Sequence, residues 1–261
     1  MSIIQAIVYG IVQGIAEFLP ISSTAHLTLL PWIFGWQNPG NVFDVALHFG
    51  TAIAVIAFFF KDWIRLVTAG VKEPTSPDGR LFWGLVIATI PGALAGVILD
   101  KYMGAFSNPL LVGILLIVMG IVLYACDKFG KNHIDLKKMG IKQSVIIGIA
   151  QVLAIIPGVS RSGITMSAGR AIGIDRESIA KFTFLLSTPI ILGDVLYHAK
   201  DLAHVNIDIL PFVVAVVTAA VVGMLSIKFL LNYLKTKSFF IFTVYRFVFG
   251  IFIIALFLIR A

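Results

Sequence analysis

Six apolar stretches, each about 20 residues long, limit what this chain can fold into more than any other feature. A helix of about 20 residues crosses the ~30 Å hydrocarbon layer of a bilayer. Since 59% of the residues are hydrophobic and 13% are charged, a water-soluble fold of this length lacks the interior to bury them. The chain is therefore predicted to be an all-α polytopic membrane protein. The expected spans are residues 43–60, 81–99, 109–126, 177–197, 211–231 and 240–259.

Basic residues predict the orientation of these spans. The chain has 20 Lys and Arg against 13 Asp and Glu, and connections rich in Lys and Arg stay on the cytoplasmic side. The basic connections are 61–80, 127–143 and 232–239, whereas those at 100–108 and 198–208 are poorer in Lys and Arg and are predicted outside. With six spans, both ends of the chain are then expected outside. The basic excess indicates membrane orientation, and no nucleic-acid partner is expected.

Two further apolar segments, residues 2–35 and 144–173, are each interrupted by a helix-breaking stretch. The first is broken at Pro20 and the second at Pro157. Each segment has room for two half-helices but not for two spans. Polar backbone at membrane depth is tolerated only where protein buries it or water reaches it. Both segments are therefore predicted to be re-entrant helical hairpins.

The two interrupted segments resemble each other. The sequence GIVQ at 10–13 matches GIAQ at 148–151, and with no gap Ser22 then falls on Ser160. Three spans follow each segment, and the two sets run in opposite directions. This order predicts one membrane domain, 1–261, formed by an inverted-topology repeat of residues 1–140 and 141–261. Paired broken segments in such repeats mark a binding site near the bilayer midplane.

The first break brings a carboxylate to membrane depth. Gln13 and Glu17 are four residues apart, so a helix places them on one face, and Pro20 ends that helix three residues later. An ionised carboxylate at this depth is costly, and a functional role is therefore the default expectation. The alternative is a structural glutamate that is hydrogen-bonded to a neighbouring helix.

Three hydroxyls and an imidazole follow that break, from Ser22, Ser23, Thr24 and His26. Ser and Thr commonly cap the N-terminus of a helix, which would explain the hydroxyls but not His26. A lone buried histidine is often a hydrogen-bonded packing residue. Beside a carboxylate and several hydroxyls, His26 is also a candidate acid, base or nucleophile.

The second break has the composition of an anion site. Gly158 gives the backbone freedom, and Ser160, Ser162 and Thr165 supply hydroxyl donors at the start of a helix whose N–H groups attract anions. Arg161 adds a guanidinium fork that suits phosphate oxygens. The alternative is a capped helix whose arginine pairs with Glu17. Both descriptions hold in turn if Arg161 pairs with Glu17 without substrate and with phosphate when substrate is bound.

Three motifs resemble the undecaprenyl-diphosphate phosphatases of the bacitracin-resistance family, and the resemblance covers essentially the whole chain. The motifs are QGIAEFLPISSTAH at 13–26, ALHFGT at 46–51 and PGVSRSGIT at 157–165. The family pattern in the first motif is Glu or Gln, then Glu, a serine-rich turn and a histidine. The residues that occupy it are Gln13, Glu17, Ser22, Ser23 and His26.

The resemblance implies hydrolysis of undecaprenyl diphosphate to undecaprenyl phosphate and inorganic phosphate in the bacterial inner membrane. This reaction recycles the lipid carrier for cell-wall synthesis, and it confers resistance because bacitracin binds the diphosphate. The resemblance also implies a divalent cation, Mg²⁺ or Ca²⁺, with Glu17 as the candidate ligand. Because Gln13 is not acidic, a metal site with two acidic ligands in this motif is not expected. The sequence leaves a homodimer open.

Two mechanisms fit these residues. In the first, Ser23 is the nucleophile and Glu17 or His26 is its base. In the second, Glu17 or His26 activates a water that attacks the phosphorus directly. Arg161 stabilises the charge in both. The further residues expected to bind substrate are Gln13, Ser22, Thr24, Gly158, Ser160, Ser162 and Thr165.

A second class of function also fits the pattern of broken helices. A transporter or flippase of an anionic polyprenyl phosphate lipid would use the same inverted repeat and the same anion site. A purely structural membrane subunit would leave the buried Glu17 and Arg161 unexplained.

Overall fold

The computed structural model describes residues 1–99, 106–198 and 208–260. Within this part, six helices are long and apolar enough to cross a membrane, which confirms an all-α multi-pass membrane protein. Their ends lie within a few residues of the predicted spans. They are α3 (Asn41–Phe58), α5 (Pro77–Leu99), α6 (Pro109–Phe129), α9 (Arg176–His198), α10 (Ile209–Leu234) and α11 (Phe240–Arg260).

Both interrupted segments form two short helices with a break between them, at the places where the sequence predicts a break. The first pair is α1 (Ile3–Ala16) and α2 (Ser23–Phe34). The second consists of α7 (Ile141–Gln151), the 3-10 turn η3 (Val152–Ile155) and α8 (Arg161–Ala171). That these pairs re-enter the membrane, and that residues 1–140 and 141–261 are repeats, stay predictions.

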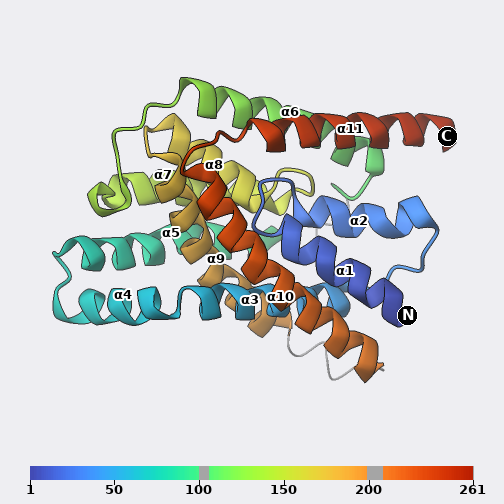
Figure 1. Cartoon of the computed structure of the whole chain (residues 1–261), viewed down its shortest axis with the longest axis horizontal. Coiled ribbons are helices and arrows are strands. Elements are labelled where there is room, and N and C mark those ends of the chain that lie inside the picture. Colours follow the sequence, from blue (N-terminus) through green and yellow to red (C-terminus); the bar gives the residue numbers. More distant parts are fainter. Residues whose placement is uncertain (100–105, 199–207, 261) are drawn as a thin grey trace.

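The connection predicted over 61–80 contains a helix, α4 (Phe60–Lys72), which is not among the elements predicted from the sequence. Charged residues are compatible with helix when they alternate with apolar ones at helical spacing. Leu66 is buried, whereas Ile64 and Val71 on the same helix are exposed. In Figure 1, α4 continues the line of α3 and pairs with α5.

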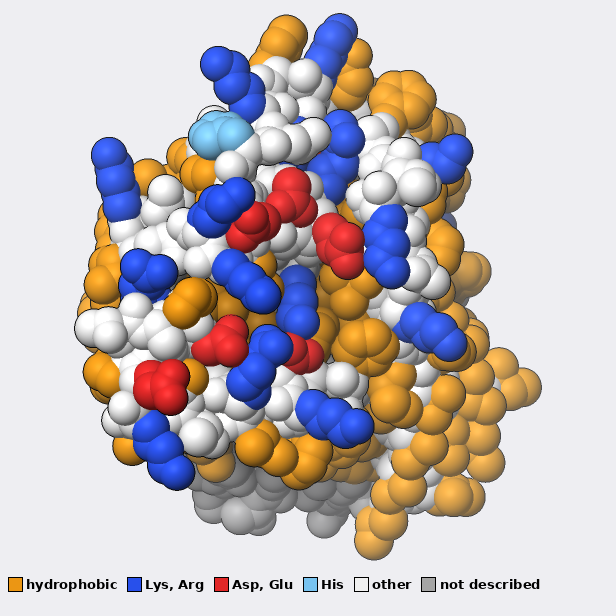
Figure 2. Space-filling view, turned by 60° about the vertical axis from the view of Figure 1, so that its left-hand side comes forward, with side chains coloured by type: hydrophobic (Ala, Val, Ile, Leu, Met, Phe, Trp, Pro, Cys, Tyr) orange, Lys and Arg blue, Asp and Glu red, His pale blue; other side chains and the backbone are white. Residues whose placement is uncertain are grey.

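The two ends of the chain lie at the same end of the molecule, opposite α4 and the connection from α6 to α7 (Figure 1). When the α4 end is turned forward, Lys and Arg side chains gather on it together with Asp and Glu, and hydrophobic side chains flank this face (Figure 2). This arrangement agrees with the predicted basic connections at 61–80 and 127–143. The predicted outer connections at 100–108 and 198–208 lie largely outside the described residues.

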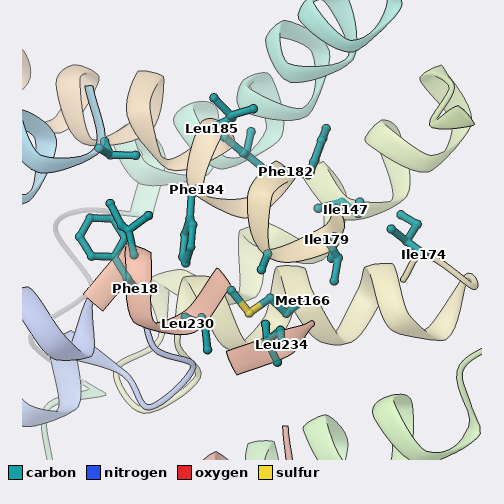
Figure 3. Packing of buried hydrophobic residues seen from close by; sticks show 14 of the residues in the cluster. Phe18, Ile147, Met166, Ile174, Ile179, Phe182, Phe184, Leu185, Leu230 and Leu234 are labelled. Atoms are coloured by element: carbon teal, nitrogen blue, oxygen red, sulfur yellow. The ribbon is translucent and has the colours of Figure 1, made fainter. Parts of the chain in front are cut away.

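The largest buried apolar cluster packs the first break against α8, α9 and α10. Phe18 from the break, Met166, Phe184 and Leu230 all belong to it, and Figure 3 shows them gathered between the helices. The rings of Phe18 and Phe184 meet edge to face with centroids 5.4 Å apart. Such a pair contributes about 1 kcal/mol beyond its buried area. The core therefore holds the break itself in place.

Candidate active site

Each break ends on a serine with a left-handed backbone. Ser22 has φ 76° and Ser160 has φ 75°, and they are the only non-glycine residues with positive φ in the described part of the chain. The Ser22 hydroxyl accepts from the Ala25 N–H at 3.3 Å, and the Ser160 hydroxyl accepts from the Gly163 N–H at 3.1 Å. Both serines are thus helix caps, and both hold a backbone geometry that is sparsely populated away from functional sites.

Glu17 joins the two breaks. It is 6% exposed at the end of α1, and one of its oxygens accepts from the Arg161 guanidinium, which comes from the start of α8. Its other oxygen, Oε2, accepts from the Ser23 hydroxyl at 2.7 Å and from the Gln13 amide at 3.1 Å. The pairing that the sequence offered for Arg161 in the absence of substrate is present.

His48, from the ALHFGT motif, is a further group that faces Glu17. Its Nε2 atom lies 3.7 Å from Glu17 Oε2. Its Nδ1 atom donates to the Asp44 carbonyl at 2.7 Å, because a carbonyl only accepts. The motif drew attention to this residue in the sequence, but no spacing rule connects α3 with the end of α1. Only the packing of these helices brings His48 to the carboxylate.

Both ring nitrogens of His26 are engaged by other groups. Nδ1 donates to the Ser22 carbonyl at 2.7 Å, and Nε2 lies 2.6 Å from the Tyr245 hydroxyl. Since Nδ1 carries the proton, Nε2 accepts from that hydroxyl. The imidazole also stacks on Phe249, with centroids 4.6 Å apart. This is the geometry of a histidine that holds the turn after the break.

The hydroxyls predicted to bind substrate divide into two groups. Thr24 pairs with the Ser22 hydroxyl at 3.2 Å, and Ser162 pairs with the Ser160 hydroxyl at 3.2 Å. Ser162 also donates to the Leu19 carbonyl at 3.0 Å, across the gap between the two breaks. Thr165 belongs to neither pair: its hydroxyl lies 2.7 Å from the Arg161 carbonyl, to which it donates, and 3.0 Å from the Thr183 hydroxyl. Gly158 has φ 99°, the left-handed conformation that glycine adopts readily.

Comparison with known proteins decides the family. The family model described as "Bacitracin resistance protein BacA" matches residues 6–252. The chain belongs to this family. It is 51% identical to an undecaprenyl-diphosphatase of Moorella thermoacetica over the full length of both chains. It is also 49% identical to one from Pelotomaculum thermopropionicum, over 98% of this chain and 97% of that one.

A third relative also matches from end to end. It is an undecaprenyl-diphosphatase of Caldicellulosiruptor bescii that is 46% identical over the full length of both chains. Because the match extends from end to end, both broken segments and all six spans fall inside it. The family assignment thus agrees with the resemblance carried by the three sequence motifs.

The side chains around Glu17 do not form a cage for a resident divalent cation. Mg²⁺ and Ca²⁺ need about six oxygen ligands, usually including one or more free carboxylates. One Glu17 oxygen is engaged by Arg161 and the other by Ser23 and Gln13. No group of three or more His, Cys, Asp or Glu side chains within the described ranges has the arrangement of a metal site. The cation that the family resemblance implies is therefore not placed by these side chains.

Proposed function

We propose that this chain is a membrane phosphatase that hydrolyses undecaprenyl diphosphate to undecaprenyl phosphate and inorganic phosphate. The observation that carries the proposal is the contact of Glu17 with both Ser23 and Arg161, which joins a nucleophile, a base and a cation from two breaks. The full-length relatives named undecaprenyl-diphosphatase support it. The reaction returns the lipid carrier to cell-wall synthesis and removes the diphosphate to which bacitracin binds.

Arg161 is the main anion-binding group in this proposal. It stands at the first residue of α8, where the helix N–H groups add positive potential, and its side chain is 16% exposed. Glu17 neutralises it while the site is empty. An arriving diphosphate would take the guanidinium, which binds phosphate oxygens in a bidentate fork. The carboxylate released from Arg161 is then free to act as a base.

Ser23 is the proposed nucleophile. Its hydroxyl already donates to Glu17 Oε2 at 2.7 Å, which is the geometry of a nucleophile and its base. As Ser23 Oγ bonds to the terminal phosphorus, its proton passes to Glu17 and the bond to the bridging oxygen breaks. Undecaprenyl phosphate leaves with that electron pair. A water then attacks the phosphoserine and both of its hydrogens stay on the phosphate, which leaves as H₂PO₄⁻, while Glu17 returns its proton to Ser23 Oγ.

Trapping separates this route from direct attack by water. Acid quenching during turnover, followed by mass spectrometry, should find phosphate on Ser23. Ser23→Ala should lower kcat by about 1,000-fold, because the nucleophile is gone. Full activity of Ser23→Ala would refute the role of Ser23 as nucleophile and favour direct attack by water.

We assign the base to Glu17 and a holding role to His26. The sequence offers either residue, but the ring nitrogens of His26 bind the Ser22 carbonyl and the Tyr245 hydroxyl. His26 supports the reaction by fixing the turn that carries Ser23. The other predicted binding residues line the same breaks, and Gln13 holds the Glu17 carboxylate.

Phosphate release from purified protein in detergent tests the proposed function. Wild-type protein with undecaprenyl diphosphate should release inorganic phosphate, and Arg161→Ala should lower kcat/KM by about 1,000-fold, since the developing charge loses its fixed cation. Lys137→Ala, in the cytoplasmic connection, is the matched control and should retain full activity. Binding of the lipid without phosphate release would overturn the phosphatase and favour the transporter.

A divalent cation remains part of the proposal. The test is phosphate release with a chelator and after adding back Mg²⁺ or Ca²⁺. Activity that disappears with chelator and returns with either ion supports a cation requirement. Unchanged activity would refute it.

We also propose an inner-membrane orientation with both ends outside. The basic connections at one end of the molecule support it. In a Cys126→Ser background, Lys137→Cys should react with an impermeant thiol reagent only from the cytoplasmic side. Labelling from outside would reverse the orientation. Light scattering of the detergent complex tests the homodimer, because the protein mass of the complex gives one chain or two.

A further inference from the structure

Arg246, in the first half of α11, lies completely buried with its guanidinium between the two breaks. Its Nε atom donates to the Pro20 carbonyl at 2.8 Å. Its Nη2 atom donates to the Val159 carbonyl at 2.8 Å and to the Gly158 carbonyl at 3.3 Å. One side chain therefore binds the backbone of both breaks at the same time.

The bound carbonyls occupy matching positions in the two breaks. Pro20 stands two residues before Ser22, and Gly158 stands two residues before Ser160. These two serines are the residues with left-handed backbones at φ 76° and 75°. Arg246 thus holds the chain just before each strained residue. A strained backbone persists only where the surrounding structure fixes it, and these bonds do so on both sides.

The charge of Arg246 is not explained by an ion pair. None of the ion pairs within the described ranges includes it. Its Nη1 atom is buried without a hydrogen-bond partner in the same part of the chain. A buried cation that is held only by carbonyls is costly. An apolar side chain would fill this space at a lower cost in free energy. The hydrogen bonds to the two breaks therefore explain why the residue is an arginine.

We propose that Arg246 is a positioning residue that ties the two breaks together and thereby sets Ser23 and Glu17 opposite Arg161. The expected effect of Arg246 on the reaction rate rests on the proposed phosphatase function, but its hydrogen bonds to the two breaks do not. Glu17 and Ser23 flank Pro20 in the first break, and Arg161 follows Ser160 in the second. If the breaks separate, the nucleophile and its base move away from the phosphate-binding cation. A misplacement of about 1 Å lowers a rate by about 100-fold.

Two substitutions remove the bridge in different ways. Arg246→Lys keeps the charge, but a single ammonium lacks the fork that reaches both sets of carbonyls. Arg246→Gln removes the buried charge, which eases folding, and keeps only one short donor group. The matched control is Arg170→Lys, because Arg170 is 1% exposed in the last turn of α8 and binds Asp127 at 2.9 Å, away from both breaks.

Hydrogen–deuterium exchange tests the tie without any activity measurement. In monodisperse detergent-solubilised protein, both Arg246 variants should exchange faster than wild type in peptides 20–26 and 158–164, by about tenfold or more. Arg170→Lys should leave these peptides unchanged and speed exchange near Gly130 and Lys131, whose carbonyls Arg170 binds. Faster exchange in only one break, or in neither, would overturn the proposal.

A double-mutant cycle tests the kinetic consequence. Arg246→Gln should lower kcat by about 100-fold with KM within about threefold of wild type. Arg161→Ala should lower kcat/KM by about 1,000-fold in wild type but by only about 10-fold in the Arg246→Gln background, because Arg161 is already misplaced there. If the two losses of kcat/KM simply multiply, Arg246 does not act through Arg161, and the positioning role is overturned.

These readouts separate the two proposals. Wild-type protein that releases no phosphate would overturn the phosphatase, while the exchange data would still decide whether Arg246 ties the breaks. An active wild type with unchanged exchange in both breaks would overturn only the role of Arg246.

Discussion

At the scale of single residues, the candidate site is organised around the hydrogen-bond donors that contact the Glu17 carboxylate. Glu17 is bound by Arg161, Ser23 and Gln13, and His48 lies 3.7 Å from the same carboxylate. The pairing of Gln13 with Glu17 follows from their spacing of four residues on one helix face. The contact with Arg161, 144 positions away, is the pairing that the sequence offered because both residues are charged and expected at membrane depth.

The hydroxyl of Tyr245 provides a residue-scale test of His26. Tyr245→Phe leaves Nε2 of His26 without its donor, while the bond from Nδ1 to Ser22 persists. Loss of one partner from a buried acceptor costs about 1–3 kcal/mol, so thermal unfolding should occur at lower temperature. Phosphate release should slow by less than about tenfold. A loss as large as that in Ser23→Ala would contradict a holding role and make His26 part of the chemistry.

At the scale of elements, α8 is fixed at both ends. Arg161 at its first residue meets Glu17, and Arg170 in its last turn meets Asp127 of α6. Asp127 also accepts from Arg176 at 2.7 Å and from the Phe239 N–H at 3.1 Å, which draws the ends of α9 and α11 to the same point. The helix that begins at Arg161, the proposed phosphate-binding residue, is therefore also anchored at its other end.

Removal of the Asp127 charge tests this anchor. Asp127→Asn leaves the buried Arg170 without its counter-charge, and breaking such a pair costs about 3–5 kcal/mol. The expected result is a large drop in the unfolding temperature of the detergent-solubilised protein. The matched control is Asp62→Asn, whose partners Arg65 and Lys181 are more exposed, and which should cost about 0–1 kcal/mol. Equal losses for the two variants would show that Asp127 is not an anchor.

At the scale of the whole molecule, the two halves of the chain interlock. The most extensive helix contacts are α1 with α10, α6 with α11, α3 with α10 and α5 with α7 (Figure 1). Each of these pairs joins a helix from residues 1–140 to one from 141–261. Neither half has a complete core without the other, and the site lies where both halves contribute a break.

Close packing of α1 on α10 depends on Gly14. A Cβ atom at Gly14 would lie 2.8 Å from the Gly223 nitrogen, so a larger side chain must push the two helices apart. Gly14→Val should cost about 1–3 kcal/mol and should lower phosphate release, because α1 carries Gln13 and ends at Glu17. The matched control is Gly96→Val, where an added Cβ meets nothing within 4 Å, and it should leave activity unchanged. Equal activity of the two variants would contradict this dependence.

Local chemistry accounts for what the sequence determined by itself. Apolar length set the spans, because a helix of about 20 residues crosses the hydrocarbon layer of a bilayer. Pro20 and Pro157 marked the breaks because polar residues follow each of them, whereas Pro31, Pro91 and Pro189 lie within helices. Ser22 and Ser160 were recognisable as candidate caps from residue type and from the alignment of the two segments. The motifs at 13–26 and 157–165 carried the resemblance to the family.

Only the tertiary structure decided how these parts meet. Helix packing brings Arg161 into contact with Glu17 and places His48 of α3 near the same carboxylate. It also places the Tyr245 hydroxyl within hydrogen-bond distance of His26 Nε2. It also made Arg246 the bridge between two carbonyls that lie more than a hundred residues apart. A spacing rule operates within one helix, whereas these contacts depend on how helices from both halves pack. The physical reason is that a buried polar group forms its hydrogen bond with whichever group helix packing places beside it. Local sequence spacing does not determine that packing.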